Sequence, residues 1–194
     1  MCISSCCSLP WRRTASPPAM PDQPVQPPPI YHERQRRELC LLHALNGLYQ
    51  SKAFTRCQLN TIACVLPSEV YDGGPCSRLR SLRYNIFYGD YDANVLARAL
   101  QSRGAEMTYH LDADAINLDD PSIIGFIFNH DNCHWAALKK INGAWVDLDS
   151  YRRVPTIVGN DDEVRQLMQQ NLANGSVLIR VISSEGRNQQ SQPA

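Results

Sequence analysis

Cys40 could act as a nucleophile in a catalytic site that also contains a histidine and an aspartate. It lies at the start of an expected helix, where unpaired backbone N–H groups and the helix dipole stabilise a thiolate. Gln35 lies five residues before it and could donate its side-chain amide to an oxyanion. We therefore take Cys40 as a candidate nucleophile, although an ordinary structural thiol would show the same local pattern.

An expected β-hairpin relates the histidine to the aspartate. Asn142-Gly143 is typical of a two-residue hairpin turn between two strand-like runs. Counting outward from the turn places His134 opposite Tyr151, and directly opposed side chains share one face of a sheet. His134 and Asp149 are therefore diagonal neighbours on that face, with backbones about 7–8 Å apart.

Two carboxylates compete for His134. Asp149 is close enough for its side chain to hydrogen-bond to the imidazole, whereas Asp147, on the same face, lies about 13 Å away. A carboxylate fixes the tautomer of an imidazole and raises its basicity. We therefore expect Asp149 to hold His134 in a catalytic site; the alternative is that both side chains lie on a solvated face.

The remaining cysteines and histidines carry weaker signals. None of the eight cysteines forms a C-x-x-C pair, which argues against zinc ribbons and thioredoxin-type motifs. Cys57 and Cys64 fall on an amphipathic stretch, and we expect them to be structural. An alternative to the catalytic site is a zinc site, although the spacing of its four ligands matches no common zinc motif. The four ligands would be Cys40, His43, Cys133 and His134.

The spacing of apolar residues changes along the chain, and it predicts which helices and strands position these residues. The first half predicts three helices, at Leu39–Gln50, Thr55–Leu66 and Ala93–Ser102, with a long surface loop expected at Ser68–Asp92. The second half predicts a helix that begins with the capping box Asn160-x-x-Glu163. It also predicts five strands: Ala105–His110, Ser122–Asn129, His134–Ile141, Ala144–Asp149 and Ser176–Ser183.

This order predicts an α+β fold. We expect the helical part, which carries Cys40, to pack on a mostly antiparallel sheet that carries His134 and Asp149. The chain of 194 residues has 19 Lys+Arg and 19 Asp+Glu, and its net charge of zero argues against a dedicated nucleic-acid binder. No run approaches the roughly 18 apolar residues of a membrane span. We expect a monomeric, cytoplasmic protein with reduced thiols, with membrane-associated or nuclear fractions as alternatives.

Prolines divide the chain. Eight of the 13 prolines lie within residues 1–29, which we expect to form a disordered tail. Residues 30–183 form the expected folded domain, and residues 184–194 a flexible tail. In the first tail, Cys2, Cys6 and Cys7 precede Arg12-Arg13 and are candidates for S-acylation, which would tether the protein to a membrane. The alternative is an unmodified tail.

Several motifs, in order, resemble those of the Josephin family, papain-like cysteine proteases that remove ubiquitin. The segment Ile30–Asn46, IYHERQRRELCLLHALN, is similar to the opening of a Josephin domain. The likeness continues in Gly89–Val95, His134-Trp135 and Trp145–Ser150, and it spans almost all of residues 30–183. The resemblance implies a papain-like Josephin fold.

The resemblance also implies a role for each residue that matches a family motif. Cys40 matches the nucleophile and His134 the general base, while Asp149 occupies the third triad position, where the family has Asn or Asp. Gln35 matches the oxyanion-hole glutamine. Asn46 matches a family asparagine to which we assign no catalytic role. No cofactor or metal is implied.

The implied activity is deubiquitination, which is thiol-dependent hydrolysis of bonds at the C-terminal glycine of ubiquitin. The implied partners are ubiquitin and ubiquitinated proteins. The chain resembles the short single-domain josephins, because neither a ubiquitin-interacting motif nor a glutamine tract follows Ser183. The alternative is a weakly active or inactive ubiquitin-binding module of the same fold.

Overall fold

The structure, a computed structural model, describes residues 29–36, 38–66 and 91–184. Three predictions lie wholly or mostly outside these ranges. They concern the two tails, the S-acylation of Cys2, Cys6 and Cys7, and the long loop at Ser68–Asp92.

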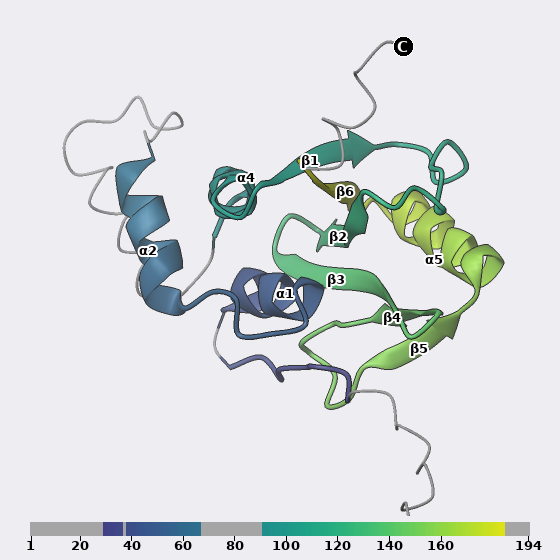
Figure 1. The fold of residues 1–194 in the computed structure, drawn as a ribbon, viewed down its shortest axis with the longest axis horizontal. Coiled ribbons are helices and arrows are strands. Elements are labelled where there is room, and N and C mark those ends of the chain that lie inside the picture. Colours follow the sequence, from purple (N-terminus) through teal and green to yellow (C-terminus); the bar gives the residue numbers. More distant parts are fainter. Residues whose placement is uncertain (1–28, 37, 67–90, 185–194) are drawn as a thin grey trace, which may run out of the picture.

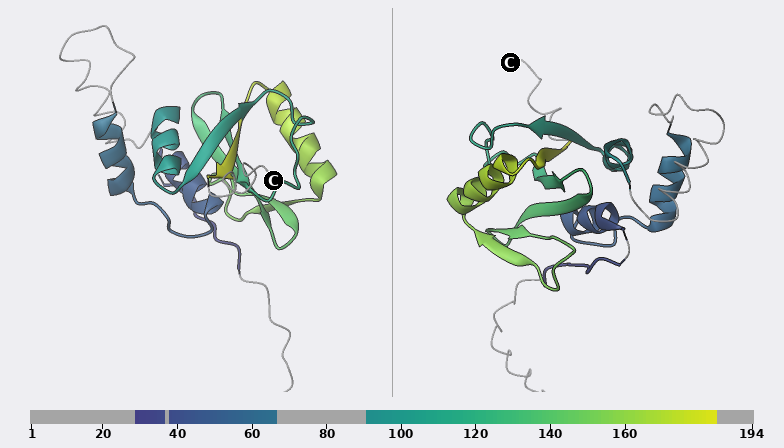
Figure 2. Two further views of the ribbon diagram at one scale, coloured as in Figure 1. Left: turned by 45° about the horizontal axis from the view of Figure 1, so that its top comes forward. Right: turned by 180° about the vertical axis from the view of Figure 1, so that it is seen from behind.

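A six-stranded sheet, with strand order β1-β6-β2-β3-β4-β5, forms the centre of the described fold (Figure 1). All of its strand pairs are antiparallel. Helices α1, α2 and α4 lie on one side of the sheet and α5 lies on the other (Figures 1 and 2). This arrangement confirms the predicted α+β fold. The elements are α1 (Cys40–Leu48), α2 (Arg56–Val65), α4 (Ala93–Gln101), β1 (Ala105–His110), β2 (Ile123–His130), β3 (His134–Ile141), β4 (Ala144–Asp147), β5 (Thr156–Gly159), α5 (Asp161–Ala173) and β6 (Val177–Ser183).

Apolar side chains fill both sides of the sheet. Leu41, Leu45 and Leu48 of α1 are fully buried in a core shared with α2 and α4. On the other side, Val164 and Met168 of α5 are buried against side chains of β2 and β4. Close packing of this kind resists displacement, so the core fixes α1 and its first residue against the sheet. None of the described helices is long and apolar enough to cross a membrane.

Helix ends follow local sequence signals. The predicted capping box forms between Asn160 and Glu163 at α5, and a second one forms between Thr55 and Gln58 at α2. Gly175 follows the end of α5 with a φ of +85°, a conformation that glycine adopts without strain. These helices therefore begin and end where side-chain chemistry predicts.

The hairpin has the predicted register. Ile141 pairs with Ala144 and Leu138 with Asp147. Asn142 and Gly143 have φ angles of +51° and +85°, as a type I′ turn requires. The β4 strand ends at Asp147, two residues earlier than predicted, because the chain leaves the ladder there.

Two sequence predictions are wrong. The predicted elements omit β5, a four-residue edge strand in which Thr156 and Ile157 are both exposed, so its pattern lacks the alternation that marks a strand. Cys57 and Cys64 are exposed rather than structural, because α2 buries Leu59 and Ala63 on its opposite face.

Candidate active site

Cys40 is the first residue of α1 and is almost fully buried. No side chain caps this helix end, so the backbone N–H groups of its first turn stay directed at the site. The Sγ atom of Cys40 lies 4.0 Å from the carbonyl oxygen of Cys133, the residue that precedes β3. The core of the protein therefore brings the thiol to the beginning of β3, where His134 lies.

His134 forms the hydrogen bond that the hairpin register predicts. Its Nε2 atom lies 2.7 Å from Oδ1 of Asp149, and the imidazole is buried. The other ring nitrogen, Nδ1, is also buried and has no conventional hydrogen-bond partner among the described residues. Because Asp149 occupies Nε2, Nδ1 is the nitrogen that remains for Cys40.

The surroundings of His134 favour its charged form. Burial lowers the pKa of His134, but the hydrogen bond to Asp149 and the interaction with Cys40 outweigh burial and raise the pKa to about 9. Burial likewise raises the pKa of Asp149, yet hydrogen bonds from His134 and the Tyr151 backbone bring it below its ordinary value. The pair is therefore an imidazolium held by a carboxylate at neutral pH.

Asp147 does not contact His134. Its Oδ1 atom accepts the backbone N–H of Asp149 at 3.1 Å, and its Oδ2 atom lies 3.4 Å from the Arg152 guanidinium. Burial raises the pKa of Asp147, and the nearby Arg152 offsets only part of that rise. Asp147 therefore supports the loop that carries Asp149, while Asp149 alone bonds to the imidazole.

Gln35 lies beside the loop after β4. Its backbone N–H donates to the carbonyl of Ser150 at 2.7 Å, and the Ser150 hydroxyl donates to Gln35 Oε1 at 3.0 Å. The amide oxygen therefore points at Ser150, and the amide nitrogen, which would donate to an oxyanion, points away from it. The structure thus fixes the orientation of the Gln35 side chain next to the residue that follows Asp149.

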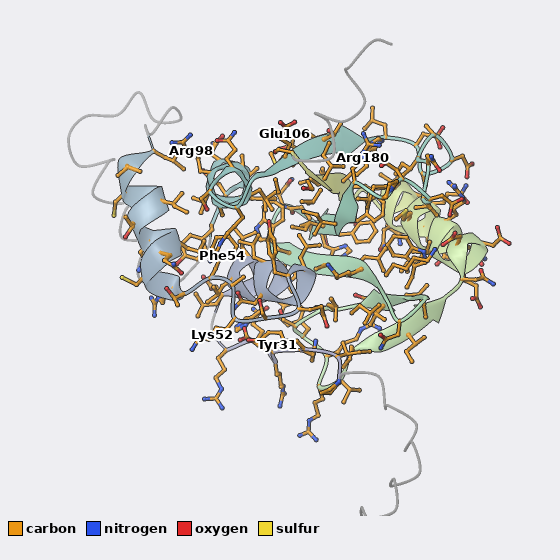
Figure 3. The ribbon with its side chains drawn as sticks, viewed as in Figure 1. Tyr31, Lys52, Phe54, Arg98, Glu106 and Arg180 are labelled. Carbon is orange, nitrogen blue, oxygen red and sulfur yellow. The ribbon has the colours of Figure 1, made fainter. Side chains whose placement is uncertain are left out.

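A partly buried polar network holds the segment that carries Gln35 against α1. Glu33 accepts hydrogen bonds from the Tyr31 hydroxyl, from His43 Nδ1 at 2.7 Å and from Asn46 Nδ2 at 3.3 Å. Asn46 also exchanges hydrogen bonds with the backbone of Phe54, and both Tyr31 and Phe54 lie close to α1 (Figure 3). Asn46 therefore has a structural role.

The network also accounts for His43, which was a candidate zinc ligand. Its Nδ1 atom is bonded to Glu33. Within the described part of the chain, no three His, Cys, Asp or Glu side chains are arranged to hold a metal ion. The zinc alternative built on Cys40, His43, Cys133 and His134 is therefore wrong.

Two aromatic residues beside His134 had no place in the site inferred from the sequence. His130 pairs with His134 across β2 and β3, with ring centroids 6.0 Å apart. The Tyr151 ring stacks on His134 at 3.9 Å. The hairpin count already placed Tyr151 opposite His134, so the signal for this contact was present in the sequence.

Comparisons with known proteins show which family this chain resembles. The Josephin family model matches residues 35–181. The chain is 34% identical to Josephin-2 from Homo sapiens over 169 residues, which cover 80% of this chain and 86% of that protein. It is 40% identical to a Josephin-like protein from Arabidopsis thaliana over 163 residues, which cover 74% of this chain but only 45% of that relative.

A more distant relative is Ataxin-3 from Gallus gallus. The two proteins are 27% identical over 147 residues, which cover 68% of this chain and 39% of that protein. The family model spans most of this chain, and the alignment with Josephin-2 spans most of both proteins. On these grounds the chain belongs to the Josephin family.

Proposed function

We propose that this protein is a deubiquitinase that hydrolyses bonds at the C-terminal glycine of ubiquitin through Cys40, His134 and Asp149. One observation carries the proposal: a thiol at a helix start lies beside an imidazole that a carboxylate holds at 2.7 Å. These are the parts of a cysteine hydrolase. Membership of the Josephin family supports ubiquitin as the substrate, and no cofactor is needed.

The proposed reaction begins with the Cys40 thiolate, which attacks the carbonyl carbon of the bond to be cleaved. The Gln35 amide and the Cys40 backbone N–H donate hydrogen bonds to the resulting oxyanion. His134, oriented by Asp149, then gives its proton to the leaving amine, and ubiquitin remains attached to Cys40 as a thioester. His134 next takes a proton from water, and the hydroxyl group attacks the thioester. The C–S bond breaks, which releases the C-terminus of ubiquitin and restores the Cys40 thiolate beside protonated His134.

Hydrolysis of a ubiquitin–fluorophore conjugate tests this proposal. We expect wild-type protein to release the fluorophore and Cys40→Ala to lose at least about 1,000-fold in kcat/KM, because the nucleophile is missing. Cys57→Ala, which removes an exposed thiol on α2, is the matched control and should keep wild-type activity. Absence of activity in wild type, or equal activity in wild type and Cys40→Ala, would contradict the proposal.

A further inference from the structure

We infer that Tyr151 is a positioning residue for His134, because its ring covers the imidazole and shields the His134–Asp149 hydrogen bond from water. The inference rests on the proposed function only where it assigns His134 a catalytic role. The ring contact itself is a property of the structure.

The two rings are in direct contact. Their centroids lie 3.9 Å apart and their planes differ by 19°, which is a stacked arrangement. His134 is 6% exposed, whereas Tyr151 is 62% exposed. The Tyr151 ring therefore has one face on the imidazole and much of its remaining surface in solvent, as a cover would.

The backbone of Tyr151 fixes this cover in place. Its N–H donates at 3.0 Å to Oδ1 of Asp149, the same oxygen that bonds to His134 at 2.7 Å. On the other side of β3, the His130 ring lies nearly parallel to His134, and its Nδ1 is bonded to the Ser176 hydroxyl at 2.8 Å. Two rings therefore lie beside the imidazole, one from β2 and one from the loop after β4.

The cover should favour the protonated imidazole for two reasons. Burial by the ring opposes protonation through desolvation, but the face of an aromatic ring attracts a cation, and a low local dielectric strengthens the hydrogen bond from the imidazolium to Asp149. We expect the two favourable effects to be larger than the desolvation, as the favourable interactions are for the site as a whole. The other titratable groups that face His134 are Cys40 from α1 and His130 from β2, while Asp147 and Arg152 act through Asp149. A change at the Tyr151 side chain leaves these groups, and the backbone bond to Asp149, in place.

A rival interpretation is that Tyr151 is simply an exposed aromatic residue that contacts the substrate. Val154 and Ile157 are also exposed apolar residues in the chain that follows β4. Neither side chain carries a ring that could stack on His134. They therefore provide matched controls, because they share the exposure of Tyr151 but not its stacking.

The test is the pH dependence of Cys40 alkylation by iodoacetate in the full-length protein, followed for the Cys40 peptide by mass spectrometry. The imidazolium attracts this anionic reagent, so alkylation slows when His134 loses its proton. The thiolate displaces iodide and forms a thioether, so the reaction needs no ubiquitin. We expect Tyr151→Ala to move the alkaline limb, where the imidazolium loses its proton, down by about half a pH unit. Tyr151→Phe, which keeps the ring, and Val154→Ala should both retain the wild-type limb.

An NMR titration of the His134 ring protons in the same variants provides a second readout, and thermal unfolding shows whether each variant is folded. The inference would be overturned if folded Tyr151→Ala kept both the wild-type alkaline limb of alkylation and the wild-type titration of the His134 ring protons. An equal shift in Tyr151→Phe or Val154→Ala would also overturn it, because the effect would not depend on the stacked ring.

Steady-state hydrolysis separates this inference from the proposed function. In ubiquitin cleavage, Tyr151→Ala should lower kcat several-fold and change KM little, whereas loss of a docking contact would raise KM alone. An increase in KM with an unchanged alkylation profile would overturn the positioning role. If wild-type protein failed to cleave ubiquitin while the alkylation limb still shifted in Tyr151→Ala, the proposed function would fall and the positioning role would stand.

Discussion

At the scale of single residues, the site depends on which carboxylate His134 bonds to. Asp149 bonds to the imidazole at 2.7 Å, whereas Asp147 bonds to the backbone of Asp149 and lies near Arg152. The two side chains are close in sequence and both are largely buried. Their contributions should nonetheless differ, because only one of them contacts the imidazole.

Substitution of the two aspartates tests this difference. We expect Asp149→Ala to lower kcat/KM for a ubiquitin–fluorophore conjugate by about 100-fold or more, because the imidazolium loses its orienting charge. Asp147→Ala should cost less than about 10-fold, since it only loosens the loop. Asp149→Asn is the conservative control and should retain more activity than Asp149→Ala. A larger loss from Asp147→Ala than from Asp149→Ala would show that the assignment is wrong.

The raised pKa of His134 predicts the alkaline limit of activity. A thiolate–imidazolium pair requires protonated His134, whose pKa is about 9, so kcat/KM should fall as the pH rises through that value. The bonds that favour the charged imidazole also contribute to the free energy of unfolding. This contribution is fully present below the ordinary histidine pKa of about 6.5, and it is lost as the pH rises through the pKa of about 9 in the folded protein.

The pH profile of Asp149→Asn checks the cause of this limit. Replacing the carboxylate by an amide removes the charge that raises the pKa of His134, so the alkaline limb should move to lower pH. The measurement is kcat/KM between about pH 6 and pH 10 in both proteins. An alkaline limb that stays in place in Asp149→Asn would mean that Asp149 does not set it.

At the scale of the elements, local signals predicted the helix ends and the hairpin, and through the hairpin they predicted the His134–Asp149 bond. Turn chemistry and side-chain alternation fix which residues of two neighbouring strands meet. The register of β3 with β4 agrees with that reasoning. The meeting of Cys40 with His134 is different, because it depends on how α1 packs on β3. Only the family resemblance anticipated that contact.

Apart from the stacking of Tyr151 on His134, the features that sequence reasoning missed lie between elements with no local pattern. Glu33 bonds to His43 across ten residues, and both lie on segments whose packing no short motif fixes. The β5 strand consists of four residues at the edge of the sheet, and it exists because β4 offers a free edge beside it. Such features follow from tertiary packing, so they required the structure.

The α5 cap provides a prediction at this scale that should affect stability alone. Asn160 accepts the backbone N–H groups of Asp162 and Glu163. Asn160→Ala should lower the free energy of unfolding by about 1 kcal/mol, measured in urea, while Asn160→Ser should restore most of it. Because α5 lies on the opposite side of the sheet from α1, kcat/KM should stay unchanged (Figure 1). A large loss of activity would contradict this separation.

At the scale of the whole molecule, the candidate site joins two layers. Cys40 comes from the helical layer, while His134 and Asp149 come from the start of β3 and the loop after β4. The Glu33 network then ties the Gln35 segment to α1. The site therefore exists only when both layers are packed together, which makes the pairing of Cys40 with His134 a property of the folded protein.

Covalent capture by ubiquitin that carries a C-terminal electrophile tests the central claim most directly, because it requires ubiquitin recognition, a reactive nucleophile and correct alignment together. We predict that the full-length protein gains one ubiquitin, that mass spectrometry maps the adduct to Cys40, and that Cys40→Ala gains none. Binding of the probe without adduct formation would contradict the proposed hydrolase and favour a ubiquitin-binding module. An adduct on Cys133 instead of Cys40 would contradict the assigned nucleophile.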